Sequence, residues 1–332
     1  EVINMLNKDR VKRIFERTDV DQLLVCEPMA VYYLLGKMFH PGERFLGVLL
    51  RRDKEAVLYV NALFRFEEDL QIRKEYFTDT DDIVELLSKE IDSTKVLGVD
   101  KTLTANFLLP MMERKIASGF VNGSLAVDLT RAVKDPKEIE LMRASSHIND
   151  LAMTEFKKLI HEGVTEIEVA NQMLDIYKKL GAEGYSFEPI VAFGDNAADP
   201  HHGPDSTVLK EGDIVLFDVG CTYHGYCSDM TRTFFYKKYP DAEAERVYNL
   251  VRAANEESTK LCGPGTVIST IDKKARDIII EGGYGEDFTH RLGHFIGLTD
   301  HEFGDVSLAN DRKEEPGNIH SIEPGIYHPG IA

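Results

Sequence analysis

Residues 214–235 read IVLFDVGCTYHGYCSDMTRTFF and decide the fold of the second half of the chain. One apolar run ends at Asp218, and a second apolar run follows Asp229. The segment between them is polar and contains two glycines, so the pattern predicts a β-hairpin. Such a hairpin brings two carboxylates together, where they repel each other unless a cation lies between them. Taken alone, the pattern also fits two solvated turn aspartates, so its meaning depends on the rest of the chain.

Length and composition limit the class of protein. The chain has 332 residues, of which 43% are hydrophobic and 29% charged, and this predicts a globular enzyme of two domains. The net charge of -18 disfavours nucleic acid and anionic membranes as partners, because both attract basic surfaces. The four cysteines form no C-x-x-C pair, and we find neither a signal peptide nor an apolar run of membrane-spanning length. We therefore expect a cytoplasmic protein.

The first part of the chain, residues 1–133, alternates helical and strand-like segments. This alternation predicts a compact α/β domain. Short buried strands are expected at 23–26, 47–50, 56–60 and 95–100, and helices at 2–17, 83–91 and 103–117.

A domain boundary is expected near residue 133, where a strong helix start begins the second part, 134–332. Asp135 suits the N-cap, Pro136 the first helical position and Glu138 the third. A second capping box starts a helix at Thr165 and Glu168. Further helices at about 241–262 and 268–280 alternate with strand-like segments (FEPIVAFG, the hairpin, FIGL and HSIEPGIY), which predicts an α+β domain.

Several polar residues of the second part could act together with the hairpin aspartates. Three motifs carry them: ADPHHGPD, THRLGHFIGLTDHE and SIEPGIY. Each motif alone is more simply explained by surface or turn residues. Together, three carboxylates and one imidazole form a donor set that suits manganese, cobalt or zinc, with charge enough for two cations. These four residues are Asp218, Asp229, His294 and Glu323.

The motifs and their order resemble those of the pita-bread metallopeptidases, the family of methionine aminopeptidase, aminopeptidase P and prolidase. The resemblance covers nearly the whole chain, includes the linker helix KDPKEIELMR at 134–143, and is strongest for bacterial Xaa-Pro dipeptidases and aminopeptidase P. It implies an α/β N-terminal creatinase-like domain followed by an α+β pita-bread catalytic domain.

The resemblance also implies roles for individual residues. The metal ligands would be Asp218 in D-x-G, Asp229 in S-D-x-T-R-T, His294 in H-x-x-x-H-x-x-G and Glu323 in E-P-G. They would hold two divalent ions per chain, Mn²⁺ with Co²⁺ or Zn²⁺ as alternatives. The catalytic residues would be His201, His290, His301 and Glu323, with His202 as a bystander.

The implied activity is hydrolysis of the Xaa-Pro bond of dipeptides or short peptides by a hydroxide that bridges two metals. A dipeptidase must bind the substrate's carboxylate, and the candidates are Arg291 and, in FHPGER, His40 and Arg44. Arg44 could equally be a solvated surface charge, and dipeptidase and aminopeptidase activities stay open. The alternatives on the same fold are a metal-free creatinase-like hydrolase and a non-catalytic binding module. Relatives are commonly homodimers, so a homodimer is expected.

Three features depart from the family pattern. Phe295 replaces a glycine of G-H-G-I-G, and TDHE at 299–302 replaces D-V-H-E. The sequence ends at Ala332, before the family's G-x-R-x-E-D motif, which supplies a fifth ligand. The resemblance therefore implies an encoded continuation past Ala332, and weak metal binding and little activity without it.

Overall fold

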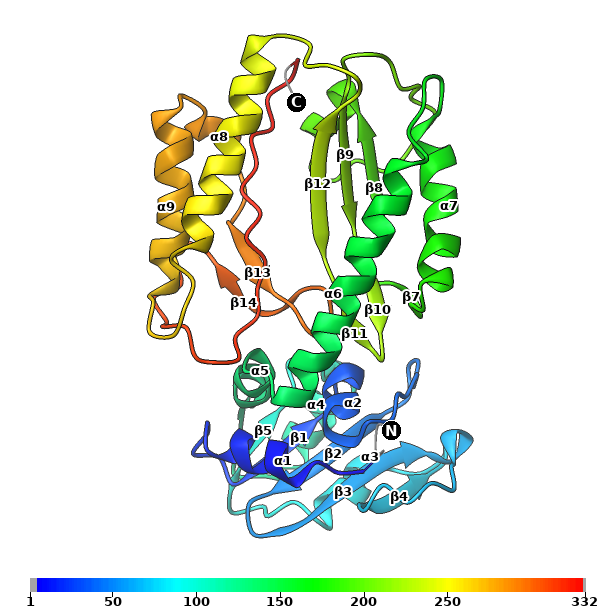
Figure 1. The fold of residues 1–332 in the computed structure, drawn as a ribbon. Coiled ribbons are helices and arrows are strands. Elements are labelled where there is room, and N and C mark those ends of the chain that lie inside the picture. The colour runs from blue at the N-terminus through cyan, green and yellow to red at the C-terminus, as the bar shows by residue number, and fades with distance from the viewer. Residues whose placement is uncertain (1–4, 331–332) are drawn as a thin grey trace. The chain divides into compact units, whose positions relative to one another are not determined.

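The computed structural model describes residues 5–330 and divides into two compact units, Glu1–Arg131 and Ala132–Ala332 (Figure 1). No helix within residues 5–330 is both long enough and apolar enough to cross a membrane.

The first unit is built on a six-stranded mixed sheet, counted over its described residues, with the order β4-β3-β2-β1-β5-β6. Its central strands β1, β2 and β3 pair antiparallel, whereas β4, β5 and β6 join the sheet in parallel. The strands are β1 (Gln22–Val25), β2 (Leu46–Arg51), β3 (Lys54–Asn61), β4 (Arg73–Phe77), β5 (Val96–Val99) and β6 (Gly119–Asn122). The helices are α1 (Lys8–Phe15), α2 (Pro28–Leu35), α3 (Ile83–Ser88), α4 (Ala105–Glu113) and α5 (Ser124–Ala132), with a 3₁₀ turn at Ala62–Phe64.

The elements predicted for the first unit are present, with shorter helices. The helix predicted at 2–17 runs only from Lys8 to Phe15, because the Asn7 side chain caps its start, and residues 2–4 lie outside the described range. The helix expected to reach 117 ends at Glu113, because Lys115 has a φ of 50° and leaves the helical conformation. The edge strands β4 and β6 were not predicted, since they are mostly exposed or half-buried and lack a buried apolar run.

The second unit has two halves, each made of two long helices and a small antiparallel sheet (Figure 1). In one half, α6 and α7 pack on one face of the sheet β12-β9-β8 around a core that includes Phe156, Tyr177 and Phe217. In the other half, α8 and α9 pack with the pair β13-β14 around Ile271, Phe288 and other apolar residues. The helices are α6 (Pro136–Lys157), α7 (Glu166–Lys179), α8 (Ala242–Thr259) and α9 (Ile268–Glu281). The strands are β7 (Gly184–Tyr185), β8 (Ile190–Phe193), β9 (Ile214–Val219), β10 (Cys221–Tyr223), β11 (Tyr226–Cys227), β12 (Met230–Phe235), β13 (Gly293–Phe295) and β14 (Glu302–Val306), with 3₁₀ turns at Gly194–Ala198 and Gly285–Asp287.

The predicted helix starts of this unit are confirmed. Asp135 and Glu138 form a capping box at α6, and Thr165 and Glu168 form another at α7. The segment HSIEPGIY, expected to be a strand, is not one. It is extended but makes a single isolated bridge, between Phe295 and His320, and its Pro324 has no N–H to donate to a ladder.

The predicted hairpin is present, but its turn is more elaborate than a simple loop. β9 and β12 pair antiparallel with Thr231 opposite Asp218. The residues between them form a second small hairpin, β10–β11, which turns at His224 and Gly225 with φ values of 48° and 79°. Gly220 separates the two hairpins, where a Cβ would lie 2.0 Å from Ser186 Oγ. A side chain at this position is therefore excluded by close packing.

Candidate active site and metal centre

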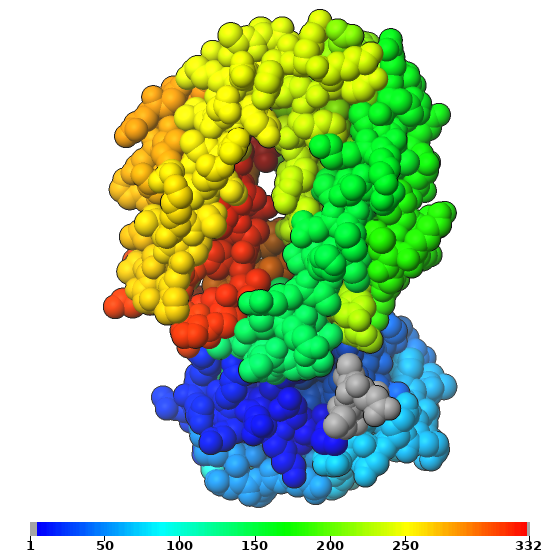
Figure 2. Space-filling view, in the orientation of Figure 1, coloured from blue at the N-terminus to red at the C-terminus, as the bar shows by residue number. Residues whose placement is uncertain are grey.

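Part of the candidate site lines a cavity of about 610 Å³ in the second unit, namely Asp218, Asp229, His290 and Glu323. Its walls come from β9, β12, α8 and the extended segment 321–327. The surface of this unit is hollowed there, between α8 in yellow, the C-terminal segment in red and β12 in yellow-green (Figure 2). Ile214, Leu216 and Asp218 of β9 line this cavity, and the alternate residues of the strand face the core under α6 and α7.

Asp218 lines the cavity, and its carboxylate has too few hydrogen-bond partners. Its Oδ1 is buried and has no hydrogen-bond partner within the described structure. Burial raises the pKa of Asp218 to about 8, and the neighbouring charges of Asp229, Glu323 and Asp300 add to the effect. A buried carboxylate among other carboxylates is costly unless a cation neutralises it.

His294 is the buried imidazole at the centre of this group. Its Nε2 lies 3.2 Å from Asp229 Oδ2 and 3.4 Å from Glu323 Oε1. Its Nδ1 lies 3.2 Å from the carbonyl of Phe295, so a proton on Nδ1 leaves Nε2 facing the two carboxylates. Burial lowers the pKa of His294, but the hydrogen bond with Asp229 and the charge of Glu323 outweigh it and raise the pKa above its usual value.

Backbone pairing with β13 holds Glu323 beside His294. Ser321 donates its N–H to the carbonyl of His294 at 2.9 Å, and Glu323 donates to the carbonyl of Leu292 at the same distance. The Ser321 hydroxyl donates to Glu323 Oε1 at 3.1 Å. Burial raises the pKa of Glu323, against the opposing influence of His294.

The structure adds Asp300, which sequence reasoning did not name. Ligand atoms of Asp229, His294 and Asp300 lie within 4.8 Å of one another. Asp300 Oδ1 is buried without a hydrogen-bond partner within the described structure. Burial, followed by the charge of Asp229, raises the pKa of Asp300 to about 7. The signal for it in the sequence is its position directly before His301 in TDHE.

His301 and Arg291 lie on the exposed side of this group. The imidazole centroids of His294 and His301 are 3.8 Å apart, and Arg291 Nη2 lies 3.4 Å from His301 Nδ1. Burial, the charge of His294 and that of Arg291 lower the pKa of His301. The charge of His201, an exposed residue, also acts on His301, so these two histidines share one neighbourhood.

His290 lines the same cavity but contacts different partners. Its Nε2 lies 3.2 Å from the Tyr327 hydroxyl, and its Nδ1 contacts the carbonyl of Arg291. Burial lowers the pKa of His290.

His202 was expected to be a bystander of the site. In the structure it pairs with the buried carboxylate of Glu166. Its Nε2 lies 2.6 Å from Oε2 of Glu166, a fully buried carboxylate. The other oxygen of Glu166 accepts from the backbone N–H of Phe193 and from the side chain of Asn196.

The two predicted substrate residues of the first unit are not part of this cavity's lining. His40 is exposed. Arg44 donates from Nε and Nη2 to the two carboxylate oxygens of Asp79, at 2.9 and 3.0 Å. Arg44 therefore has a carboxylate partner within its own unit.

The donor set around His294 fits a divalent metal ion. It combines a buried imidazole with four carboxylates. Burial, and after it the repulsion from neighbouring carboxylates, raises the pKa of Asp218, Asp300 and Glu323. Two buried oxygens of the group have no hydrogen-bond partner among residues 5–330. Hard oxygen donors with one imidazole suit manganese, cobalt or zinc, and such centres serve hydrolytic chemistry.

A two-unit architecture with this donor set is that of a metallopeptidase, and the chain belongs to metallopeptidase family M24. The sequence profile of that family matches residues 140–332, and the profile of the creatinase/prolidase N-terminal domain matches residues 8–133. The predicted order of a creatinase-like domain followed by a pita-bread catalytic domain is thus confirmed. The family implies that the chain is a peptidase and uses divalent metal.

Similar proteins include uncharacterised peptidases and solved prolidases. An uncharacterised peptidase of Staphylococcus aureus is 37% identical over 324 residues, covering 94% of this chain and 89% of the relative. The prolidase from Pyrococcus horikoshii is 31% identical with a TM-score of 0.87, covering 97% of this chain and 92% of the other. The Xaa-Pro dipeptidase from Bacillus anthracis is 30% identical with a TM-score of 0.87, covering 97% and 91%.

Proposed function

We propose that this protein is a dinuclear metal-dependent peptidase that hydrolyses the Xaa-Pro bond of dipeptides or short peptides. The observation that carries the proposal is the group of carboxylates around His294, of which Asp218 and Asp300 each have a buried oxygen with no hydrogen-bond partner in the described part of the chain. The similarity to a solved prolidase and a solved Xaa-Pro dipeptidase, both at 30% identity or more, supports the choice of substrate.

Asp218, Asp229, His294 and Glu323 would hold the metals, and Asp300 lies close enough to take part. We assign two ions per chain, Mn²⁺ with Co²⁺ or Zn²⁺ as alternatives. When bound, such ions supply Lewis-acid activation of the scissile carbonyl and of the attacking water.

Different side chains of the protein would transfer protons and position the substrate. Glu323 would accept the proton of the attacking water, because its carboxylate has a raised pKa and lies against His294. His201 and His301 would stabilise the developing negative charge on the carbonyl oxygen and assist the leaving nitrogen. His290, held by Tyr327, would orient the substrate in the cavity.

Arg291 is our candidate for the carboxylate of a dipeptide. It is exposed and reaches His301 at the edge of the group. A cation at this position would favour substrates that end at the proline. Arg44 is a weaker candidate in this respect, since Asp79 already occupies its guanidinium.

The test compares hydrolysis of Ala-Pro and Ala-Ala by the Mn²⁺-loaded full-length protein and its Asp229→Ala variant. We expect Ala-Pro to be cleaved preferentially, and the variant to lose cleavage and bound metal together while keeping its circular dichroism spectrum. The matched control is Asp311→Ala, which removes an exposed aspartate that pairs with Ser269. Undiminished Ala-Pro hydrolysis by the Asp229→Ala variant would refute the metal-dependent mechanism, and equal cleavage of both dipeptides would refute the Xaa-Pro preference.

A further inference from the structure

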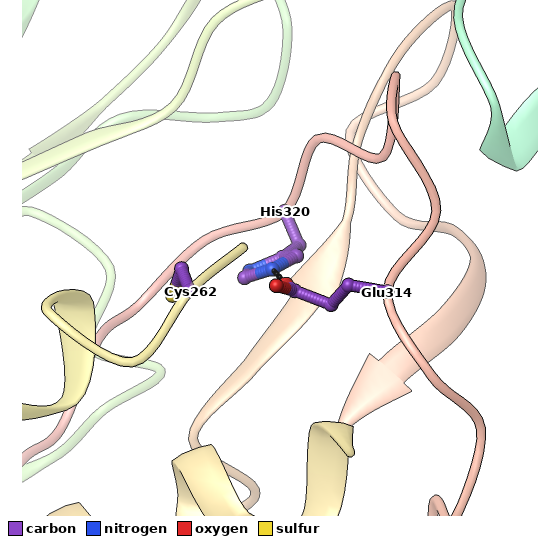
Figure 3. Close-up of side chains that lie close together, drawn as sticks. All are labelled: Cys262, Glu314 and His320. Carbon is purple, nitrogen blue, oxygen red and sulfur yellow. Dashed lines mark hydrogen bonds and ion pairs between the residues drawn. The ribbon is translucent and has the colours of Figure 1, made fainter. Parts of the chain in front are cut away.

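A second group of metal-type ligands lies in the second unit, apart from the candidate active site. Cys262, Glu314 and His320 come from three segments far apart in sequence, and their ligand atoms lie within 4.8 Å of one another. Figure 3 shows the three side chains together, with His320 and Glu314 joined by a hydrogen bond. Of the three such groups found within residues 5–330, this one contains a cysteine.

The group faces away from the candidate active site. His320 and Glu323 are three residues apart on one extended segment, so their side chains leave opposite faces. The ring of His320 packs against Phe295, with centroids 5.5 Å apart, whereas the preceding residue, His294, faces the carboxylates. The two groups therefore lie on opposite faces of the same pair of extended segments.

Backbone groups orient each of the three side chains. His320 Nδ1 lies 3.1 Å from the carbonyl of Ser321 and can donate to it, so loss of the proton that Nε2 shares with Glu314 leaves an Nε2 lone pair for a metal. Glu314 Oε2 accepts the N–H of Gly263, which fixes the carboxylate. The thiol of Cys262 lies 3.7 Å from the carbonyl of Ser258, in the last turn of α8. Histidine ligands of metals are commonly oriented in this way through their other nitrogen.

The loop that carries Cys262 is tied to the segment that carries Glu314. Gly265 donates its N–H to the carbonyl of Glu314, and Glu314 donates its N–H to the carbonyl of Thr266, both at 2.8 Å. A bridge between Val267 and Lys313 continues this pairing. The relative position of the ligands is therefore set by backbone pairing before any metal arrives.

We propose that Cys262, Glu314 and His320 bind one zinc ion, with water as the fourth ligand, at a site separate from the proposed catalytic metals. A thiolate and an imidazole favour zinc, whereas the carboxylate-rich active site favours harder ions. The thiolate and the carboxylate balance the two charges of the ion, so the complex is neutral in a largely buried setting, where Glu314 is 7% exposed. Binding releases the thiol proton and the proton between His320 and Glu314. Through Cys262 and His320, the ion connects the loop after α8 to the extended segment that contains Glu323.

The first test is titration of the full-length protein with Co²⁺, observing thiolate-to-cobalt charge-transfer absorption in the near ultraviolet. We expect a saturable band that disappears in Cys262→Ser and His320→Ala. The matched control is Cys26→Ser, which removes another half-buried free cysteine and keeps the band. The Asp229→Ala variant also keeps the band, so this result is independent of the proposed peptidase function. Absence of the band, its persistence in Cys262→Ser, or its loss in Cys227→Ser instead would overturn the proposal.

The second test needs no change to the three ligands. Zinc is added to the Asp229→Ala variant, and its surroundings are measured by X-ray absorption spectroscopy. We expect one sulfur scatterer at about 2.3 Å, the usual zinc–thiolate distance. Zinc with only nitrogen and oxygen neighbours would show that Cys262 is not a ligand.

Discussion

Two adjacent histidines, His201 and His202, have different surroundings, and we expect them to have different roles. His201 is exposed and close enough to His301 for its charge to act on it. The side chain of His202 is 12% exposed and bonds to the fully buried Glu166. Glu166 also accepts a hydrogen bond from the backbone N–H of Phe193, the last residue of β8. The hydrogen bonds of Glu166 therefore help to hold β8 in the core.

Replacing His202 by alanine should therefore reduce stability and leave catalysis intact. The buried carboxylate of Glu166 would lose a partner, which costs roughly 1–3 kcal/mol of unfolding free energy. Urea unfolding measures this, and kcat/KM for Ala-Pro should stay close to the wild-type value. The paired variant, His201→Ala, should lower kcat roughly 10²–10⁴-fold with no loss of stability, as for a residue that assists proton transfer. The opposite assignment of the two effects would show that the roles are exchanged.

At the residue scale, the sequence predicted those site residues that stand in short, recognisable motifs. Asp218, Asp229, His294 and Glu323 could be named in advance because each stands in a recognisable local pattern. In the structure the three carboxylates line one cavity, and His294 contacts Asp229 and Glu323. Their roles as ligands remain a proposal. The pairing of His202 with Glu166 could not be predicted, because it depends on packing between residues 36 positions apart. The group around Cys262 was equally hidden, since its members have no characteristic spacing.

At the scale of elements, local signals predicted the starts of helices better than the extended segments. Asp135 and Thr165 cap their helices as predicted, because capping depends on residues only three positions apart. The small hairpin β10–β11 and the coil form of the segment around Glu323 depend on what packs beside them. Neither is determined by the local sequence.

Gly293, at the start of β13, should be intolerant of any side chain. A Cβ there would lie 2.1 Å from the carbonyl oxygen of Ser321, the residue that pairs with His294 and bonds to Glu323. Gly293→Ala should push these segments apart, cost roughly 1–3 kcal/mol of unfolding free energy through overpacking, and weaken Mn²⁺ binding roughly 10–100-fold. Calorimetric titration and urea unfolding measure the two effects.

The matched control is Gly119→Ala in β6. A Cβ at Gly119 would meet only Val96 Cγ2, at an ordinary 3.7 Å. This variant should bind Mn²⁺ as the wild type does. If Gly293→Ala bound Mn²⁺ with wild-type affinity, the pairing of Ser321 with β13 would not be what positions the ligands.

At the scale of the whole molecule, the first unit carries no catalytic motif of its own. We propose that the protein is a homodimer in which residues 1–130 help to cover the partner's active site. Sedimentation velocity at micromolar concentration should give a species of twice the chain mass of 37.5 kDa. A single species at the monomer mass would contradict this proposal.

The central claim is that the carboxylates around His294 form a dinuclear metal centre. The most direct measurement is a crystal structure of the Mn²⁺-loaded full-length protein, with anomalous difference density recorded at the manganese edge. We predict two peaks roughly 3.5–4 Å apart, as in other two-metal hydrolytic sites, bonded to Asp218, Asp229, His294 and Glu323. A well-ordered cavity without anomalous density, in crystals grown at saturating Mn²⁺, would contradict the claim.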